Sequence, residues 1–150
     1  MTIPNYEETL TQPLSSDALI EQRVASLIGR AARRQLWFLF LDHEDVQLPL
    51  VLPFDDPPIR PDASIANLAE VIDGAADAAN AKSVIVVIER YADATFTDAD
   101  KEWARSIVAA LDRRGVEVRS ILLSHRRGVR WFAQDDYGLP APTGLPGPID

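Results

Sequence analysis

Acidic side chains gather just after the most β-prone run of the sequence, Val84 to Ile88. Glu89, Asp93 and Asp100 surround the expected end of that strand and the expected start of a helix, a common place for ligand sites in α/β proteins. Two or three carboxylates together with water suit a divalent cation such as magnesium. Aspartates also occur in a first helical turn for purely structural reasons, because they satisfy its free amide groups. We favour the structural interpretation, predict no metal site, and keep the three acids as candidate ligands only.

Arginines accompany the last expected hairpin. Arg119, Arg126, Arg127 and Arg130 are candidate binding residues, because clustered guanidinium groups hold phosphates well. Strand alternation predicts Arg119 and Arg130 on one face of the hairpin and Trp131 on the other. The alternative is a solvated sheet edge that charge protects from self-association. The net charge of −8 argues against nucleic acid as the partner, although a local basic face is compatible with it.

No complete catalytic set is visible in the sequence. His43 and His125 both fall in expected turns, where polar side chains are common. Ser124 and His125 are neighbours in sequence and therefore lack the geometry of a catalytic triad. The Gly-x-Ser-x-Gly, Gly-x-Gly-x-x-Gly and phosphate-binding-loop motifs do not occur. We therefore predict no catalytic residue and no cofactor.

Length and composition indicate one globular domain in 150 residues. The absence of cysteine excludes a disulfide framework, a thiolate metal site and a cysteine nucleophile. The first residues show no signal-peptide pattern, and no apolar run is long enough to cross a bilayer. We therefore expect a cytoplasmic protein without a membrane partner.

The first expected elements are a helix and a β-hairpin. Ser15 or Ser16 caps the helix, and three cations are expected to close its last turn: Arg30, Arg33 and Arg34. The apolar runs 36–41 and 46–52 predict the two strands of the hairpin. Pro49 places the second strand at a sheet edge or at a bulge, because proline has no N–H to donate.

Helices and strands then alternate. Asp62 or Ser64 is expected to cap a second helix, and Val84 to Ile88 to form the central strand. Thr97 and Asp100 have capping-box spacing at the start of a third helix. The final hairpin is expected over the ranges 116–123 and 129–132.

Together these elements predict an α/β fold in which three helices pack on a mixed five-stranded sheet, in the order α-β-β-α-β-α-β-β. The domain is expected to span residues 15–133. A loose arm over residues 1–14 precedes it, and a tail rich in proline and glycine follows over residues 134–150.

Residues 81–132 resemble the RadC-like branch of the JAB (MPN) metalloprotease fold. In that family a central strand ends in a His-x-His-Pro motif, and a Ser-x-x-Asp motif follows at a helix start. The residues here at the two histidines, the proline, the serine and the aspartate are Val87, Glu89, Arg90, Thr97 and Asp100. Only Asp100 matches a ligand position. Because zinc needs three protein ligands to hold an activated water, the resemblance implies a scaffold that has lost its metal and its protease chemistry. A looser likeness, to bacterial proteins that end in a similar Arg-Trp strand, implies no function.

We predict a non-catalytic protein-interaction domain whose partner is another protein or a second copy of the chain. The missing catalytic set, the lost metal motif and the open sheet edges support this prediction. One alternative is a divalent-metal hydrolase acting on phosphoesters, with Glu89, Asp93 and Asp100 as metal ligands and the arginines gripping the substrate. A second alternative is nucleic-acid binding through the arginine-rich final hairpin, with an affinity that falls steeply with salt.

Overall fold

The computed structural model describes residues 12–133. Within them, one mixed sheet of five strands has the order β2-β1-β3-β4-β5. The strands are β1 (Gln35–Leu41), β2 (Gln47–Asp55), β3 (Ser83–Glu89), β4 (Glu117–His125) and β5 (Gly128–Phe132). The helices of the described part are α2 (Asp17–Leu27), α3 (Ile65–Ala79) and α4 (Asp98–Asp112). The predicted α/β class, the element order and the central position of β3 are confirmed.

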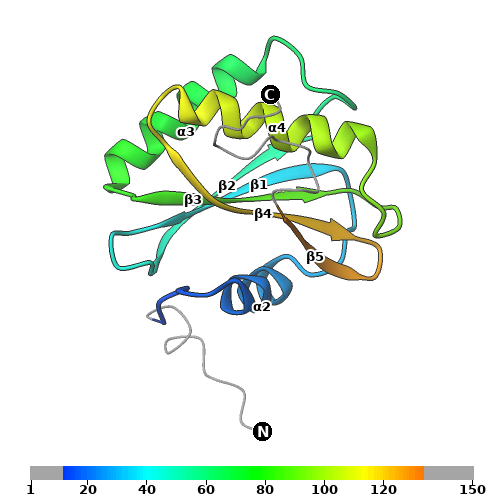
Figure 1. The fold of residues 1–150 in the computed structure, drawn as a ribbon, viewed down its shortest axis with the longest axis horizontal. Helices are drawn as coiled ribbons and strands as arrows, with labels where there is room; N and C mark the ends of the chain where they lie inside the picture. Colours follow the sequence, from blue (N-terminus) through cyan, green and yellow to red (C-terminus); the bar gives the residue numbers. More distant parts are fainter. Residues whose placement is uncertain (1–11, 134–150) are drawn as a thin grey trace, which may run out of the picture.

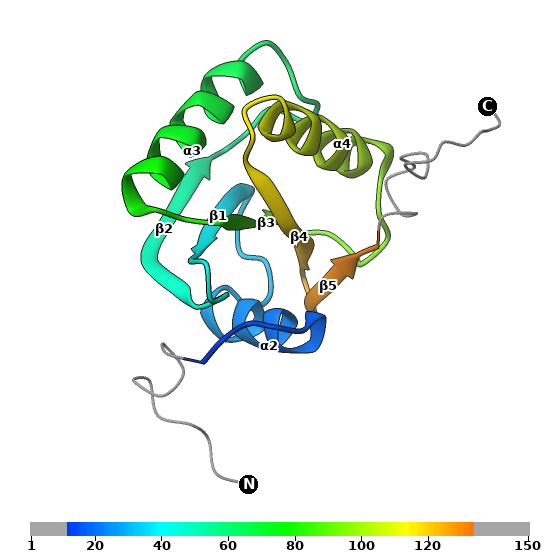
Figure 2. The same ribbon diagram turned by 60° about the vertical axis from the view of Figure 1, so that its left-hand side comes forward.

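The sheet lies between two helical layers. Helices α3 and α4 cover one face and α2 covers the other, as Figure 1 shows, and the rotated view in Figure 2 agrees. Strands β3 and β4 are parallel, whereas the pairs β1–β2, β1–β3 and β4–β5 are antiparallel. None of the helices in the described residues is both long and apolar enough to cross a membrane.

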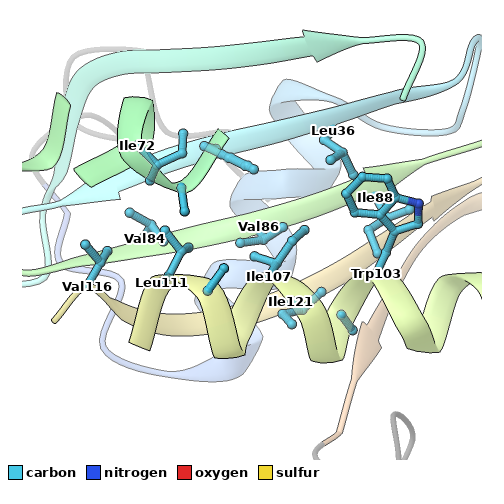
Figure 3. Close-up of a cluster of buried hydrophobic side chains, with 14 of the residues drawn as sticks. Leu36, Ile72, Val84, Val86, Ile88, Trp103, Ile107, Leu111, Val116 and Ile121 are labelled. Atoms are coloured by element: carbon cyan, nitrogen blue, oxygen red, sulfur yellow. The ribbon is translucent and has the colours of Figure 1, made fainter. Parts of the chain in front are cut away.

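Two apolar clusters fill the two sides of the sheet, because side chains alternate along its central strands. Val86 and Ile88 face α3 and α4. Ile85 and Val87 face α2. Figure 3 shows the first cluster, in which Trp103 of α4 lies beside Ile88. The whole of β3 is buried, as its unbroken apolar run predicts.

The predicted arm and tail lie mostly outside the described residues. Residues 1–11 and the whole tail over 134–150 are not described. Within the described part of the arm, Leu14 is only 1% exposed and belongs to the cluster under α2. Its N–H donates to the carbonyl oxygen of Asp45 at 2.7 Å. Leu14 therefore packs with the domain, one residue before the predicted boundary.

Local hydrogen bonds explain where the helices begin. Ser16 caps α2 by accepting from an amide of the first turn at 3.2 Å. At the start of α4, the Thr97 hydroxyl accepts from Asp100 N and the Asp100 carboxylate accepts from Thr97 N, so the predicted capping box is confirmed. Ser64 occupies the cap position of α3 without capping it. Its own N–H donates to the Asp62 carboxylate instead, at 2.9 Å.

Helix α2 ends earlier than expected. It stops at Leu27, and the chain turns at Gly29, whose φ of 69° lies in the left-handed region that glycine adopts at little cost. The prediction that Arg30, Arg33 and Arg34 close this helix is therefore wrong. Apolar residues recur at helical spacing from Leu19 as far as Ala31, which favours a longer helix, but Ala31 is buried outside the helix.

Strand β2 is an edge strand, as Pro49 predicts. Its register against β1 shifts between Leu39 and Leu41, next to this proline. A second proline, Pro53, pairs with Trp37 in the regular part of the ladder. Proline is tolerated on an edge strand, because only one side of such a strand pairs with a neighbour.

Candidate functional site

The Glu89 carboxylate is bound by the protein itself. Glu89 follows Val87 in the alternation of β3 and lies on the α2 side of the sheet, where it is 5% exposed. One oxygen accepts from Ala32 N at 2.8 Å and Arg33 N at 3.2 Å. The other accepts from Trp37 Nε1 at 2.8 Å. These donors satisfy the buried charge and fix the segment that carries them.

Asp100 is bound by the cation next to Glu89. Arg90 Nη2 lies 2.7 Å from Asp100 Oδ2, and its Nε lies 3.0 Å from both carboxylate oxygens. The same guanidinium donates to the carbonyl oxygens of Asp93 at 2.8 Å and Thr95 at 2.7 Å. Arg90 therefore holds the loop between β3 and α4 in place through hydrogen bonds to its carbonyl oxygens.

The three candidate metal ligands do not come together. Glu89 lies on the α2 side of the sheet, whereas Asp100 belongs to α4 on the opposite side. Asp93 is exposed, and its carboxylate accepts from Thr95 N, which lowers the pKa of Asp93. Within residues 12–133 no three His, Cys, Asp or Glu side chains are arranged to hold a metal ion.

The positions that carry the resemblance to the RadC-like branch have structural roles here. Val87 is fully buried in the cluster under α2. Arg90, which stands in place of the family's proline, pairs with Asp100, which stands at the remaining ligand position. The Asp100 oxygens are thus taken by Arg90 and by the cap of α4.

His125 is not in a turn, contrary to the prediction. It is the last residue of β4 and 9% exposed, because β4 extends past the predicted end at Leu123. Its Nδ1 accepts from Arg127 N at 3.3 Å. Burial lowers the pKa of His125, and the nearby cations of Arg90, Arg130 and Arg127 lower it further. His43, by contrast, is exposed in the β1–β2 turn as predicted.

The structure separates Arg119 from Arg130, which were predicted to share a face. Arg130 faces the α4 side of the sheet. The Arg119 guanidinium lies instead 3.1 Å from the Asp17 carboxylate of α2, on the other side. The cause is a register shift: Val118 and Ser120 pair with consecutive residues of β3, so Arg119 is an extra residue in β4.

A second arginine-rich segment lies against the final hairpin. Residues 29–34 cross the carboxyl ends of β3 and β4: Ser124 Oγ donates to Gly29 O at 2.6 Å, and Ala31 N donates to His125 O at 2.8 Å. This crossing places the segment that carries Arg30 and Arg33 beside the β4–β5 turn. The resulting surface, called the arginine end below, consists of Arg30, Arg33, Arg126, Arg127 and Arg130, all of them exposed.

Most of these cations are free to meet a ligand. Within the part of the chain that the structure describes, the guanidinium groups of Arg30, Arg33, Arg126 and Arg127 form no hydrogen bond or ion pair. Arg130 is more constrained, since it donates to a loop carbonyl at 2.9 Å and stacks 4.1 Å from the centre of an aromatic ring. A ligand can therefore bind four of these guanidinium groups without breaking hydrogen bonds or ion pairs within the protein.

One exposed aromatic residue borders the arginine end. Tyr91 is 71% exposed, and its neighbour Ala92 accepts a hydrogen bond from Arg126 N at 2.9 Å. Asp93 lies close enough for Arg126 to lower its pKa, so one acid partly offsets the arginines here. The local balance remains positive, in a chain whose net charge is −8.

Sequence reasoning found only part of this surface. The hairpin arginines were predicted, but Arg30 and Arg33 were assigned to a helix end, and Tyr91 was not singled out as a candidate. Gly29 was the available signal that the helix stops before Arg30. Nothing local indicates that the segment after it lies against a turn almost a hundred residues later, as the 95-residue separation of Gly29 and Ser124 illustrates.

The opposite end of the sheet carries acids as well as cations. The β1–β2 turn carries Asp42, Glu44 and Asp45, and in the sheet it neighbours the amino ends of β3 and β4. Glu117 begins β4 there. Cations lie there too, in the residues just before β3 and β4, so the acids at this end are partly offset.

An apolar groove lies between β2 and α3. It has a volume of about 280 Å³ and is lined by Phe38, Leu52, Pro53, Phe54, Ser64, Asn67, Leu68, Val71 and Ile72. No lining side chain titrates, so the groove offers no acid or base for chemistry.

No protein-family model matches the chain, and no curated protein matches its sequence. The resemblance to the RadC-like branch therefore stays a prediction. The geometry of the arginine end carries the functional proposal.

Proposed function

We propose that this chain is a non-catalytic cytoplasmic domain that binds another protein, with the arginine end as its contact surface. The observation that carries the proposal is the meeting of two arginine-rich segments, residues 30–33 and 126–130, on one exposed surface. Arginine and tyrosine are enriched where protein interfaces gain most of their binding energy. Arg126 and the exposed Tyr91 border each other here.

The groups that would perform chemistry are occupied by structural bonds. The carboxylates of Glu89 and Asp100 are held by amides, an indole and a guanidinium. The Ser124 hydroxyl donates to a main-chain carbonyl instead of to His125. A phosphoester hydrolase would need some of these groups free, so the interaction domain is favoured over it.

The surface is also rigidly presented, which lowers the entropy lost on binding. The β4–β5 turn is tied to residue 92 through Arg126 N and to residue 31 through His125 O. The loop after β3 is held from within by Arg90. Ligand sites at the carboxyl ends of strands are common in α/β folds.

The β2 edge is a weaker candidate surface. Pro49 and Pro53 remove two N–H groups from the strand, and edge prolines oppose pairing with another strand. This favours the arginine end over strand addition. The resemblance to the RadC-like branch fits the proposal, as a scaffold that kept its shape after losing its metal.

Cross-linking in native lysate followed by mass spectrometry tests the proposed function. Arg126→Gln/Arg127→Gln removes two cations from the arginine end. Arg113→Gln/Arg114→Gln is the matched control, because it removes two adjacent exposed arginines at the opposite end of the sheet. We expect one protein to cross-link near residues 30–33 and 126–130 of the wild type and of the control, and to be lost with the first variant. A partner that both variants retain equally contradicts the proposal.

A further inference from the structure

We propose that the arginine end recognises a short, extended acidic segment of its partner, through carboxylate side chains. This inference rests on the proposed function and adds the chemistry of the ligand. The two groups of cations lie on either side of a seam, which the hydrogen bond from Ala31 N to His125 O closes. Arg30 and Arg33 lie on one side, and Arg126 and Arg127 on the other. An extended chain lying along the seam meets arginines from both sides.

The type of cation favours carboxylates. Every cation of the arginine end is arginine, whose planar guanidinium binds a carboxylate through two parallel hydrogen bonds. The main chain of the same segment already binds one carboxylate, from inside the protein. The Glu89 side chain accepts hydrogen bonds from the main-chain N–H groups of residues 32 and 33.

The surroundings limit the ligand to a short one. Asp93 lies beside Arg126, and Asp98 is exposed at the start of α4 beyond the same loop. Asp56 N donates to Arg34 O at 3.1 Å, so a further exposed acid lies beside the last residue of the crossing segment. A nucleic acid carries a charge about every 1.7 Å of duplex and would continue past the arginines into this acidic rim. A brief run of glutamates ends before it.

Fluorescence anisotropy with a labelled poly-glutamate peptide tests the inference on the full chain. A single-stranded oligothymidylate of matched net charge serves as the nucleic-acid probe, measured at the same salt concentrations. We expect poly-glutamate to bind more tightly than the oligonucleotide, with an affinity that falls as salt rises. Arg126→Gln/Arg127→Gln should weaken this binding about tenfold, given the size of exposed charge interactions. Arg113→Gln/Arg114→Gln should leave it unchanged.

Two results overturn the inference. Tighter binding of the oligonucleotide assigns the surface to nucleic acid, and no binding of either probe removes the acidic ligand. Thermal unfolding of both variants controls for loss of structure, since all four arginines are exposed.

The cross-linking experiment and the anisotropy experiment test the two proposals separately. A partner lost with Arg126→Gln/Arg127→Gln, without poly-glutamate binding, keeps the proposed function and rejects the acidic segment. Poly-glutamate binding without any partner cross-linked at the arginine end rejects the proposed function.

Discussion

Arg90 Nη2 lies 2.7 Å from Asp100 Oδ2, in an ion pair whose two side chains are only 10% and 5% exposed. The pair joins the residue after β3 to the first turn of α4. It also explains why neither residue is available to a metal or a substrate. A buried pair of this kind tolerates the loss of one partner poorly, because the remaining charge stays buried without compensation.

Arg90→Met should therefore lower the free energy of unfolding by about 3–5 kcal/mol. Urea denaturation monitored by tryptophan fluorescence measures the change. Arg114→Met is the matched control, because Arg114 pairs with Asp73 at the surface, where such a pair contributes about 1 kcal/mol or less. Equal losses in the two variants would contradict a structural role for the buried pair.

Glu89→Gln should also destabilise the protein, by about 1–3 kcal/mol, because one carboxylate oxygen becomes an amide that cannot accept from the donors around it. The fluorescence of Trp37 should change as well, since its indole N–H donates to this carboxylate. Urea denaturation and emission spectra check the two effects. Unchanged stability would mean that Glu89 does not hold residues 32 and 33 in place.

Divalent cations should not bind the described domain. Isothermal calorimetry with magnesium, manganese and zinc should give no saturable heat, and the melting temperature should not rise, because the Glu89 and Asp100 oxygens already have protein donors. The hydrolase alternative would regain support from saturable binding that Asp100→Asn abolishes.

His125 should make stability depend on pH. Burial lowers the pKa of folded His125 below the usual value of 6.5, so the unfolded chain binds the proton more readily. Its contribution to stability is therefore present above about pH 6.5 and is lost as the pH falls from there through the folded pKa. His125→Gln should flatten this part of the stability profile, measured by urea midpoints across pH. His43→Gln, in the exposed β1–β2 turn, should leave the slope as in the wild type.

The two prolines of β2 should keep its edge from pairing. Pro49→Val/Pro53→Val restores two N–H groups to an exposed apolar strand, so we expect self-association that sedimentation velocity detects as a larger species. Adding Val51→Lys to that variant should reverse the effect, because Val51 is 38% exposed and an edge lysine opposes pairing. An unchanged sedimentation coefficient in the double variant would show that the prolines do not protect the edge.

Much of the fold is predictable because its signals are local. The apolar run of β3, the capping box of Thr97 and Asp100, and the edge position implied by Pro49 each depend on a few neighbouring residues. These signals agree with one another, which is why the element order is confirmed.

The candidate site depends on contacts that are distant in sequence, and there prediction fails. A single extra residue in β4 moves Arg119 to the other face, and no local pattern announces it. The position of Arg30 and Arg33 depends on hydrogen bonds to Ser124 and His125, which only the folded chain brings near.

The same long-range contacts have a consequence for how the chain is made. Helix α2 leaves the ribosome well before β4, which supplies one of the groups that fix it: Asp17 and Arg119 are 102 residues apart in sequence. Until β4 is synthesised, the apolar face of this helix has no complete sheet to cover. We expect the apolar face of α2 to need chaperone shielding until β4 is made, and the arginine end to form only once β4 and β5 have joined the sheet.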